Sequence, residues 1–234
     1  MNTVVKKKNK AVIGGKTKWI VIIKQWIHQG FTYLDHTERF YRIIWELIPF
    51  SIAMTILLSM DKISITSSII ISFIIAHTLN WVFNYNFWTC LDFTFPRILN
   101  PGNDQTIEYL KKMQIRLSKK KYITGCMIYG SVSRHVWHNK SDLDMRIMGK
   151  KGVLNGFKIY WTVFIERLIA VREKQPLDLY QADSIKFLNR MREDEFPIFL
   201  IFRDERLQKR YGNCKETDMS KVSNLNNINN TPND

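Results

Sequence analysis

The sequence has few cysteines and few acidic residues. Its three cysteines, Cys90, Cys126 and Cys214, are odd in number and far apart. This spacing excludes the disulfide framework of a small secreted fold and the paired cysteines of a zinc site. We therefore expect reduced thiols in a cytosolic setting, with Cys126 in the core because it lies in an apolar run.

Aspartate and glutamate together number 21, against 35 lysines and arginines, so the net charge is +14. Such a surplus favours a polyanionic partner, which includes nucleic acid, nucleotide phosphates and anionic lipid headgroups. The chain has no motif that interleaves aromatic and basic residues for nucleic-acid recognition, so composition alone leaves a nucleic-acid partner open.

The first 42 residues are basic and then amphipathic. Residues 1–18 have no apolar period and are followed by no cleavage pattern of a signal peptide, which indicates a cytosolic tail. Between Trp19 and Phe31, apolar residues recur at helical spacing. This pattern predicts a helix that lies either in the headgroup region of a membrane or on the protein's own core.

Residues 43–83 contain two long apolar stretches. The second, residues 63–83, has no charged residue, and at about 1.5 Å per residue it reaches the ~30 Å of a bilayer's hydrocarbon core. The first, residues 43–60, carries Glu46 near its start, and only two residues separate the stretches. We predict a transmembrane hairpin, with two buried helices of a soluble domain as the alternative.

Charge and polar residues refine this prediction. Lys and Arg flank the hairpin on both sides, so the positive-inside rule places both termini and any following domain in the cytosol. His77 and Asn80 lie within the second stretch, where we expect them to bond the partner helix or an oligomer. Residues 84–102 are aromatic and broken by two prolines, which predicts an interfacial linker.

Residues 103–213 alternate between helical and strand patterns. They predict an α/β (α+β) domain in which a small mixed sheet is flanked by helices. We expect helices at 104–119, 152–172 and 183–192, and strands at 121–129, 141–148, 176–180 and 196–202. Residues 214–234 are rich in Asn, Ser, Thr and Lys and have no apolar period, so we predict a disordered tail.

A Gly-Ser pair and an Asp-x-Asp motif carry the chemistry. Gly130 permits a sharp turn and a close approach to a ligand. Ser131 offers a hydroxyl and an N–H where we expect a helix to begin, an arrangement that attracts phosphate. Asp142 and Asp144 alternate with Leu143, so on a strand both carboxylates share one face. Two such hard oxygen ligands suit Mg²⁺ bound to a triphosphate.

A third carboxylate is expected on a neighbouring strand. Asp178 is flanked by apolar residues on the predicted strand 176–180, and a charge in such a run is unfavourable unless it faces a site. Asp183 is the weaker candidate, because it fits the start of the following helix as a cap.

The run Tyr-Gly-Ser-Val-Ser-Arg at 129–134, followed by Ser-Asp-Leu-Asp-Met at 141–145, resembles the signature of the DNA polymerase beta-type nucleotidyltransferase superfamily, particularly its minimal members. The resemblance covers residues 120–205. It implies a short mixed sheet that binds NTP with Mg²⁺ (or Mn²⁺), transfers an NMP and releases pyrophosphate. His135 departs from the pattern, because minimal members usually have glycine after the motif arginine.

The resemblance also implies residue roles. Gly130, Ser131, Arg134 and Ser141 would bind the nucleotide, while the metal would be held by Asp142, Asp144 and Asp178. We therefore predict a membrane-anchored nucleotidyltransferase with a cytosolic active site. The tether suggests a membrane- or lipid-linked acceptor as a hypothesis, with a soluble small molecule, a protein side chain or an RNA end as alternatives, and an oligomer stays open. The alternatives are a nucleotide sensor with a degenerate transferase fold and a structural membrane protein.

Overall fold

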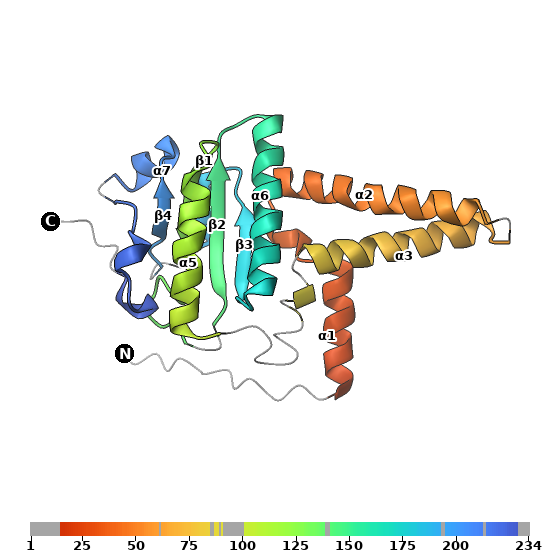
Figure 1. Ribbon diagram of the computed structural model, residues 1–234, viewed down its shortest axis with the longest axis horizontal. Helices are drawn as coiled ribbons and strands as arrows, with labels where there is room; N and C mark the ends of the chain where they lie inside the picture. The colour runs from red at the N-terminus through yellow and green to blue at the C-terminus, as the bar shows by residue number, and fades with distance from the viewer. Residues whose placement is uncertain are drawn as a thin grey trace, which may run out of the picture.

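The computed structural model describes residues 15–60, 62–84, 87–88, 90, 101–138, 141–192, 195–212 and 214–228. Within them a mixed α/β domain carries a helical hairpin that projects from one side (Figure 1). The helices are α1 (Gly15–His28), α2 (His36–Leu58), α3 (Ile65–Phe83), α5 (Asn103–Ser118), α6 (Val153–Arg172) and α7 (Glu205–Arg210). Short 3-10 helices are η1 (Phe31–Tyr33), η2 (Ile185–Arg190), η3 (Met219–Lys221) and η4 (Leu225–Asn227).

The strands β1 (Ile123–Ile128), β2 (Leu143–Gly149), β3 (Leu177–Gln181) and β4 (Ile198–Phe202) form one sheet in the order β3-β2-β1-β4. β1 pairs antiparallel with β2 and β4, whereas β2 and β3 are parallel and are joined through α6. The predicted mixed α/β class is confirmed, and each predicted strand lies within two residues of its place.

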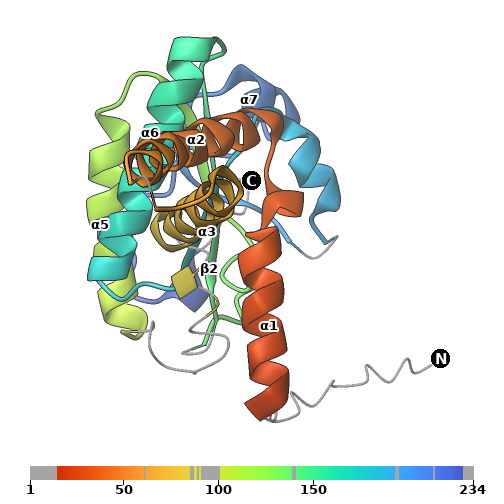
Figure 2. The ribbon, with the colours of Figure 1, turned by 90° about the vertical axis from the view of Figure 1, so that its right-hand side faces the viewer.

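Alternation along β2 separates the two faces of the sheet. Leu143, Met145 and Ile147 point into a core that α5 and α6 cover, and Figure 2 shows both helices on the same side of β2. Asp144 and Arg146 point to the opposite face, where they line a pocket. A second apolar cluster on that face packs η2 and α7 against the sheet. The polar residues of β2 therefore lie on the face that α5 and α6 leave open.

The hairpin consists of α2 and α3, which pack side by side and run away from the domain (Figure 1). At its base the Glu46 carboxylate of α2 accepts a 2.8 Å hydrogen bond from Asn80 Nδ2 and lies 2.8 Å from His77 Nδ1. His77 Nε2 is 2.9 Å from the carbonyl oxygen of Trp26 in α1. The prediction that His77 and Asn80 bond the partner helix is confirmed.

Both hairpin helices are long and apolar enough to cross a membrane, judged by length and composition. Most of their large apolar side chains are exposed, from Ile43 to Leu58 in α2 and from Ile65 to Leu79 in α3. A core helix of a soluble domain buries such side chains, so exposure disfavours the alternative of two buried helices.

α2 begins at His36 rather than at the predicted residue 43, because its first turns dock on the α/β domain. The buried Glu38 carboxylate accepts hydrogen bonds from Arg42 at 2.9 Å and from Arg167 of α6 at 2.8 Å. Its second oxygen accepts from the Gln181 N–H of β3 at 2.8 Å. The predicted boundary between residues 42 and 43 therefore falls inside a continuous helix.

α1 has features of both arrangements that its sequence predicts, a helix packed on the protein's own core and a helix in the headgroup region. Trp26 Nε1 donates to Thr78 Oγ1 at 3.1 Å, and Gln29 Nε2 donates to the His77 carbonyl at 2.7 Å, so one side of the segment packs on α3. The other side leaves four large apolar side chains exposed: Trp19, Ile20, Ile23 and Ile27. Its contact with a membrane stays a prediction.

The prediction of a disordered tail from residue 214 was wrong for residues 214–228. η3 and η4 bury Met219, Leu225 and Ile228 in the main core, and Gln114 of α5 binds the Thr217 carbonyl at 2.7 Å. Three well-spaced apolar side chains suffice to anchor this polar segment, although they form no helical or strand period. Residues 229–234, most of the predicted linker at 84–102, and residue 140 lie outside the described residues.

The predicted helix at 183–192 is a 3-10 helix at 185–190. Asp183 does not cap that helix. Its carboxylate accepts a 2.9 Å hydrogen bond from the Thr37 N–H in the first turn of α2. The α/β domain thus supplies a side-chain acceptor to the N-terminus of the hairpin, where helical N–H groups lack partners.

Candidate functional site

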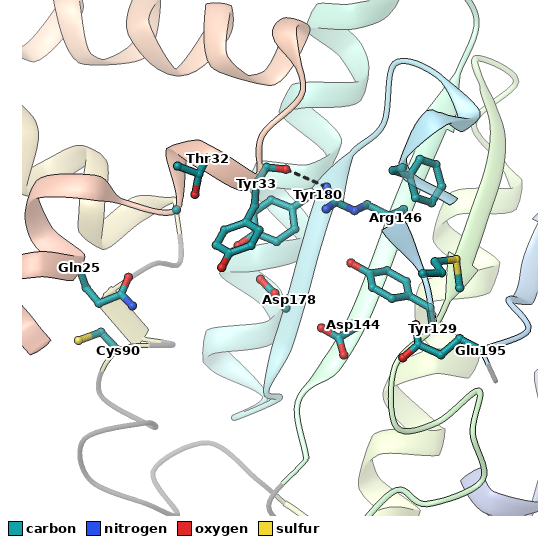
Figure 3. A pocket seen from close by; sticks show the side chains of 13 residues that line it. Gln25, Thr32, Tyr33, Cys90, Tyr129, Asp144, Arg146, Asp178, Tyr180 and Glu195 are labelled. Carbon is teal, nitrogen blue, oxygen red and sulfur yellow. Dashed lines mark hydrogen bonds between the residues drawn. The ribbon is translucent and has the colours of Figure 1, made fainter. Parts of the chain in front are cut away.

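Two carboxylates predicted for the site meet on neighbouring strands. Asp144 of β2 and Asp178 of β3 are register partners in the parallel pair, so their Cα atoms lie at the ~4.8 Å spacing of adjacent strands. Both side chains point into the pocket shown in Figure 3. Asp142 precedes β2 by one residue and is exposed. The parallel register thus brings Asp144 and Asp178 together on one face of the sheet, whereas Asp142 lies outside the paired strand and does not line the pocket.

Burial and like charge perturb this cluster. The pKa of Asp144 is raised to about 8, first by burial and then by the charges of Asp142, Asp178 and Glu195. The pKa of Asp178 is also raised, mainly by burial, although a hydrogen bond from Tyr180 opposes the shift. Among the ion pairs of the described residues, none includes Asp144 or Asp178. Buried carboxylates without a paired cation destabilise the fold unless a cation neutralises them.

Gly130 is required by its position beside Asp144. Its φ is +72°, and a Cβ atom built on it would overlap the Asp144 carboxylate. A side chain here would therefore be excluded both by the backbone conformation and by the carboxylate. The close neighbour of Gly130 in the structure is the second aspartate of the motif, while the expected approach of its backbone to a ligand stays a prediction.

The loop after Gly130 is a series of turns at residues 130–135 rather than the start of an α-helix, which corrects the expected setting of Ser131. The Ser131 hydroxyl is buried and has no hydrogen-bond partner among the described residues. Arg134 donates from Nε to the Gly130 carbonyl at 3.1 Å and lies 3.3 Å from Glu195. The Ser141 hydroxyl accepts from the His138 N–H at 3.2 Å, so Ser141 shapes the turn before Asp142.

His135, where the chain departs from the family pattern, has a φ of +57°. That left-handed conformation is the one that glycine adopts most readily. The chain holds it by contacts with the C-terminal segment, since His135 Nδ1 lies 3.1 Å from the Asn226 carbonyl. The Asn226 side chain also brackets Trp137, accepting from its N–H at 2.8 Å and donating to its carbonyl at 3.0 Å. The segment predicted to be disordered therefore holds the motif loop in place.

The carboxylates open into a pocket of about 560 Å³. Its walls come from both parts of the molecule, with Gln25, Gly30, Thr32, Tyr33 and Cys90 on one side and residues of the α/β domain on the other. Those on the α/β side include Tyr129, Asp144, Arg146, Asp178, Tyr180, Phe187, Met191 and Glu195.

Arg146 is the basic residue of this pocket wall, which Figure 3 shows beside Tyr33 and Tyr180. Its guanidinium lies 4.7 Å from the centre of the Tyr180 ring and 5.8 Å from that of Phe187. Nη1 donates to the Tyr33 carbonyl at 3.4 Å, while Nε is buried without a hydrogen-bond partner. Arg146 thus joins the N-terminal segment to the site and retains an unused donor.

The oxygen atoms at the site partly meet the needs of a hard divalent cation. Oxygen atoms of Asp144 and Asp178 match the preference of Mg²⁺ and Mn²⁺. The described residues hold no cluster of three or more His, Cys, Asp or Glu side chains able to bind a metal ion. Mg²⁺ commonly uses one or two protein carboxylates, with phosphate oxygens and waters completing its shell. The assignment of Asp142, Asp144 and Asp178 as metal ligands stays a prediction.

Several site residues were missed by the sequence analysis. Arg146 could have been found, because it follows Asp144 by two positions and therefore shares its face of β2. Tyr33 and Gln25 could not, since they come from the N-terminal segment and reach the site through the docking of α2. The chain matches no protein-family model, no curated protein sequence and no solved structure.

Proposed function

We propose that the chain is a membrane-anchored nucleotidyltransferase that moves an NMP from ATP or another NTP to an acceptor hydroxyl or phosphate. The proposal rests on the register of Asp144 with Asp178. Beside this pair lies Gly130, where the Asp144 carboxylate leaves no room for a side chain. Paired carboxylates next to a turn in which the Ser131 hydroxyl has no hydrogen-bond partner among the described residues suit a triphosphate with its cation.

The position of each residue in the site determines its proposed role. Ser131 donates its unpartnered hydroxyl to a phosphate oxygen, and Asp144 and Asp178 hold the cation. When bound, Mg²⁺ or Mn²⁺ neutralises charge on the phosphates and on the two carboxylates. The acceptor oxygen bonds to the α-phosphorus, the bond from that phosphorus to the β-phosphate oxygen breaks, and pyrophosphate leaves. Asp178, whose pKa is raised, takes the proton when the acceptor is a hydroxyl.

The shape of the pocket favours an acceptor at the membrane. Its N-terminal wall, from Gln25 to Tyr33, lies between α1 and the start of α2, at the base of the proposed transmembrane hairpin. Arg146, which lines the pocket, offers its positive charge to an anionic group of that acceptor. We therefore propose a lipid-linked alcohol or phosphate as acceptor, with the catalytic domain in the cytosol.

The test uses membranes of cells that express the full chain, since these hold the natural acceptor pool. Membranes are incubated with Mg²⁺ and NTP labelled on the α- or the γ-phosphate, then extracted with organic solvent. Label from the α-position, and none from the γ-position, is expected in the lipid extract. Label in a nuclease-sensitive fraction would instead identify nucleic acid as acceptor, and absence of transfer in every fraction would contradict the enzyme.

A second candidate is a nucleotide sensor that binds without turnover. The lack of a three-ligand metal cluster among the described residues favours it, as does the hydrogen bond that Tyr180 makes with Asp178. A sensor would bind labelled NTP but form no NMP adduct. An incidental Asp-x-Asp in a structural membrane protein is disfavoured, because such a motif has no reason to align with Asp178.

A further inference from the structure

α6 presents an apolar stripe to the surface of the molecule. Five large apolar side chains are exposed along it, with fractional exposures of 77% for Val153, 77% for Leu154, 50% for Phe157, 44% for Trp161 and 37% for Ile165. At 100° per residue they fall within one third of the helix circumference. The opposite side of α6 packs into the core. The stripe is therefore a distinct surface that meets α2 only at its margin, where Phe157 contacts Tyr41 and Trp161 lies near Trp45, and that is otherwise exposed among the described residues.

The base of the hairpin adjoins this stripe. Trp161 lies next to Trp45 of α2, with ring centres 6.4 Å apart, and stacks on Phe164 at 5.2 Å. Tyr160 Oη donates to Asn84, directly after α3, at 3.4 Å. Both α6 and α1 run across the direction of the hairpin where it leaves the domain (Figures 1 and 2). α6 and α1 therefore present their sides, rather than their ends, to the medium that surrounds the hairpin.

The length of α3 determines how deep this base must lie. α3 has 19 residues, which at about 1.5 Å per residue gives ~28 Å. The hydrocarbon core of a bilayer is ~30 Å thick. α3 therefore crosses only when it is immersed along its whole length, to Phe83. Because the residue after Phe83 contacts α6, full immersion brings α6 to the membrane surface.

Charge favours the same orientation. The one acidic residue of α6, Glu166, is buried and paired with Arg116 at 2.6 Å, whereas Lys158 is exposed beside the stripe. On α1, Lys24 lies among the exposed apolar residues. Apolar side chains flanked by lysines, without exposed acids, match the boundary between acyl chains and anionic headgroups.

We infer that α6 is a second membrane-contacting helix, and that together with α1 it holds the α/β domain against an anionic bilayer surface. This inference rests on the proposed insertion of the hairpin. It places the pocket wall formed by Gln25 and Tyr33 next to the lipid, so that a lipid-linked acceptor reaches Asp144 without leaving the membrane. A second copy of the chain covering the stripe is the alternative occupant.

The test attaches an environment-sensitive fluorophore at one introduced cysteine in the full-length protein, with Cys90 and Cys214 replaced by serine and the fully buried Cys126 retained. Leu154→Cys probes α6, Ile56→Cys probes the hairpin, and Ile115→Cys on α5 is an exposed apolar control far from the hairpin. Each variant is reconstituted in vesicles of phosphatidylcholine and phosphatidylglycerol with spin-labelled lipid as quencher. All three side chains are exposed, so labelling does not disturb the core.

We expect lipid-borne quenching at positions 56 and 154, several-fold above that at 115, with position 154 quenched best by a spin label near the headgroup. Quenching at 56 but not at 154 would overturn the inference and leave the membrane anchor standing. Disulfide cross-linking of Leu154→Cys between copies, without quenching, would assign the stripe to a dimer. Absence of quenching at 56 would contradict the membrane anchor and the inference together.

Discussion

Asp144 and Asp178 are direct neighbours across the parallel strands β2 and β3, and both line the same pocket. Desolvation and the charge of Asp178 both raise the pKa of Asp144, so the charged forms of the two carboxylates disfavour each other. This relationship joins the Asp-x-Asp motif to a residue that follows it by a whole helix and strand. It also makes the site a source of instability in the absence of a cation.

The first prediction concerns stability against pH in the presence of a chelator. The pKa of Asp144 is about 8 in the folded protein and ~3.9 in the unfolded chain. Because the folded pKa of Asp144 is raised, this carboxyl does not destabilise the fold below pH ~3.9. Its contribution to the free energy of unfolding is lost as the pH rises through about 8. Asp144→Asn should therefore raise the free energy of unfolding at pH 8, by on the order of 1–3 kcal/mol, and change little at pH 4.

Thermal unfolding in detergent at both pH values measures this difference. The groups that face Asp144 are Asp142, Asp178 and Glu195, which raise its pKa, and Arg146, which lowers it. Asp104→Asn on α5 is the control, because it makes the same chemical change at an exposed carboxylate outside the pocket. A lower stability of Asp144→Asn at pH 8 would contradict the proposed repulsion.

The second prediction separates backbone strain from close packing. Gly130 and Gly102 both have positive φ, but a Cβ on Gly130 would overlap the Asp144 carboxylate, while one on Gly102 meets nothing within 4 Å. Gly102→Ala should lower stability by the ~1–3 kcal/mol of a side chain in a backbone conformation that glycine alone adopts readily. Gly130→Ala should lower it further and abolish NTP binding, which equilibrium binding of labelled NTP measures. Equal effects of the two variants would show that the contact with Asp144 is unimportant.

The third prediction concerns the C-terminal segment. Asn226→Ala removes two hydrogen bonds to the main chain of Trp137, each contributing ~0.5–1.5 kcal/mol. Because Trp137 belongs to the loop that starts at Gly130, NTP affinity should fall together with stability. Asn227→Ala is the matched control, since Asn227 is exposed in the same 3-10 helix. Unchanged NTP affinity in Asn226→Ala would limit the segment to a stabilising role.

The fourth prediction concerns the docking of α2. Glu38→Ala leaves Arg42 and Arg167 buried without their carboxylate, which destabilises by ~3–5 kcal/mol in comparable buried pairs. Glu108→Ala removes an exposed pair with Lys112 and should change stability by less than ~0.5 kcal/mol. Thermal unfolding in detergent distinguishes the two. A small effect of Glu38→Ala would mean that α2 does not depend on the α/β domain.

Local pattern was enough to locate the sheet and the motif. Strand alternation predicted that Asp142 and Asp144 share a face, and the apolar run at 176–180 placed Asp178 on a strand. The parallel register that brings Asp178 beside Asp144 depends on the length and packing of α6, which no local pattern specifies. The tail was missed for a related reason, because Met219 and Leu225 become anchors only where α5 and the core receive them.

The contribution of the N-terminal segment could not be predicted at all. Tyr33 reaches the pocket because Glu38, a charged residue in a helix expected to start later, pairs with Arg167 far along the chain. Charge pairs between distant segments have no signature in sequence spacing. By contrast, the polar contacts within the hairpin were predictable, because His77 and Asn80 are rare residues in an apolar stretch and need a partner.

The most direct test of the central proposal compares Asp144→Asn with wild type in transfer of labelled α-phosphate from NTP to the membrane fraction. Both proteins are assayed with Mg²⁺ at equal amounts of folded protein, and Asp104→Asn serves as the matched control. We expect transfer by wild type and Asp104→Asn, and a loss of at least ~100-fold in Asp144→Asn, because charge stabilisation dominates this chemistry. Equal transfer by Asp144→Asn and wild type would contradict the assignment of this site.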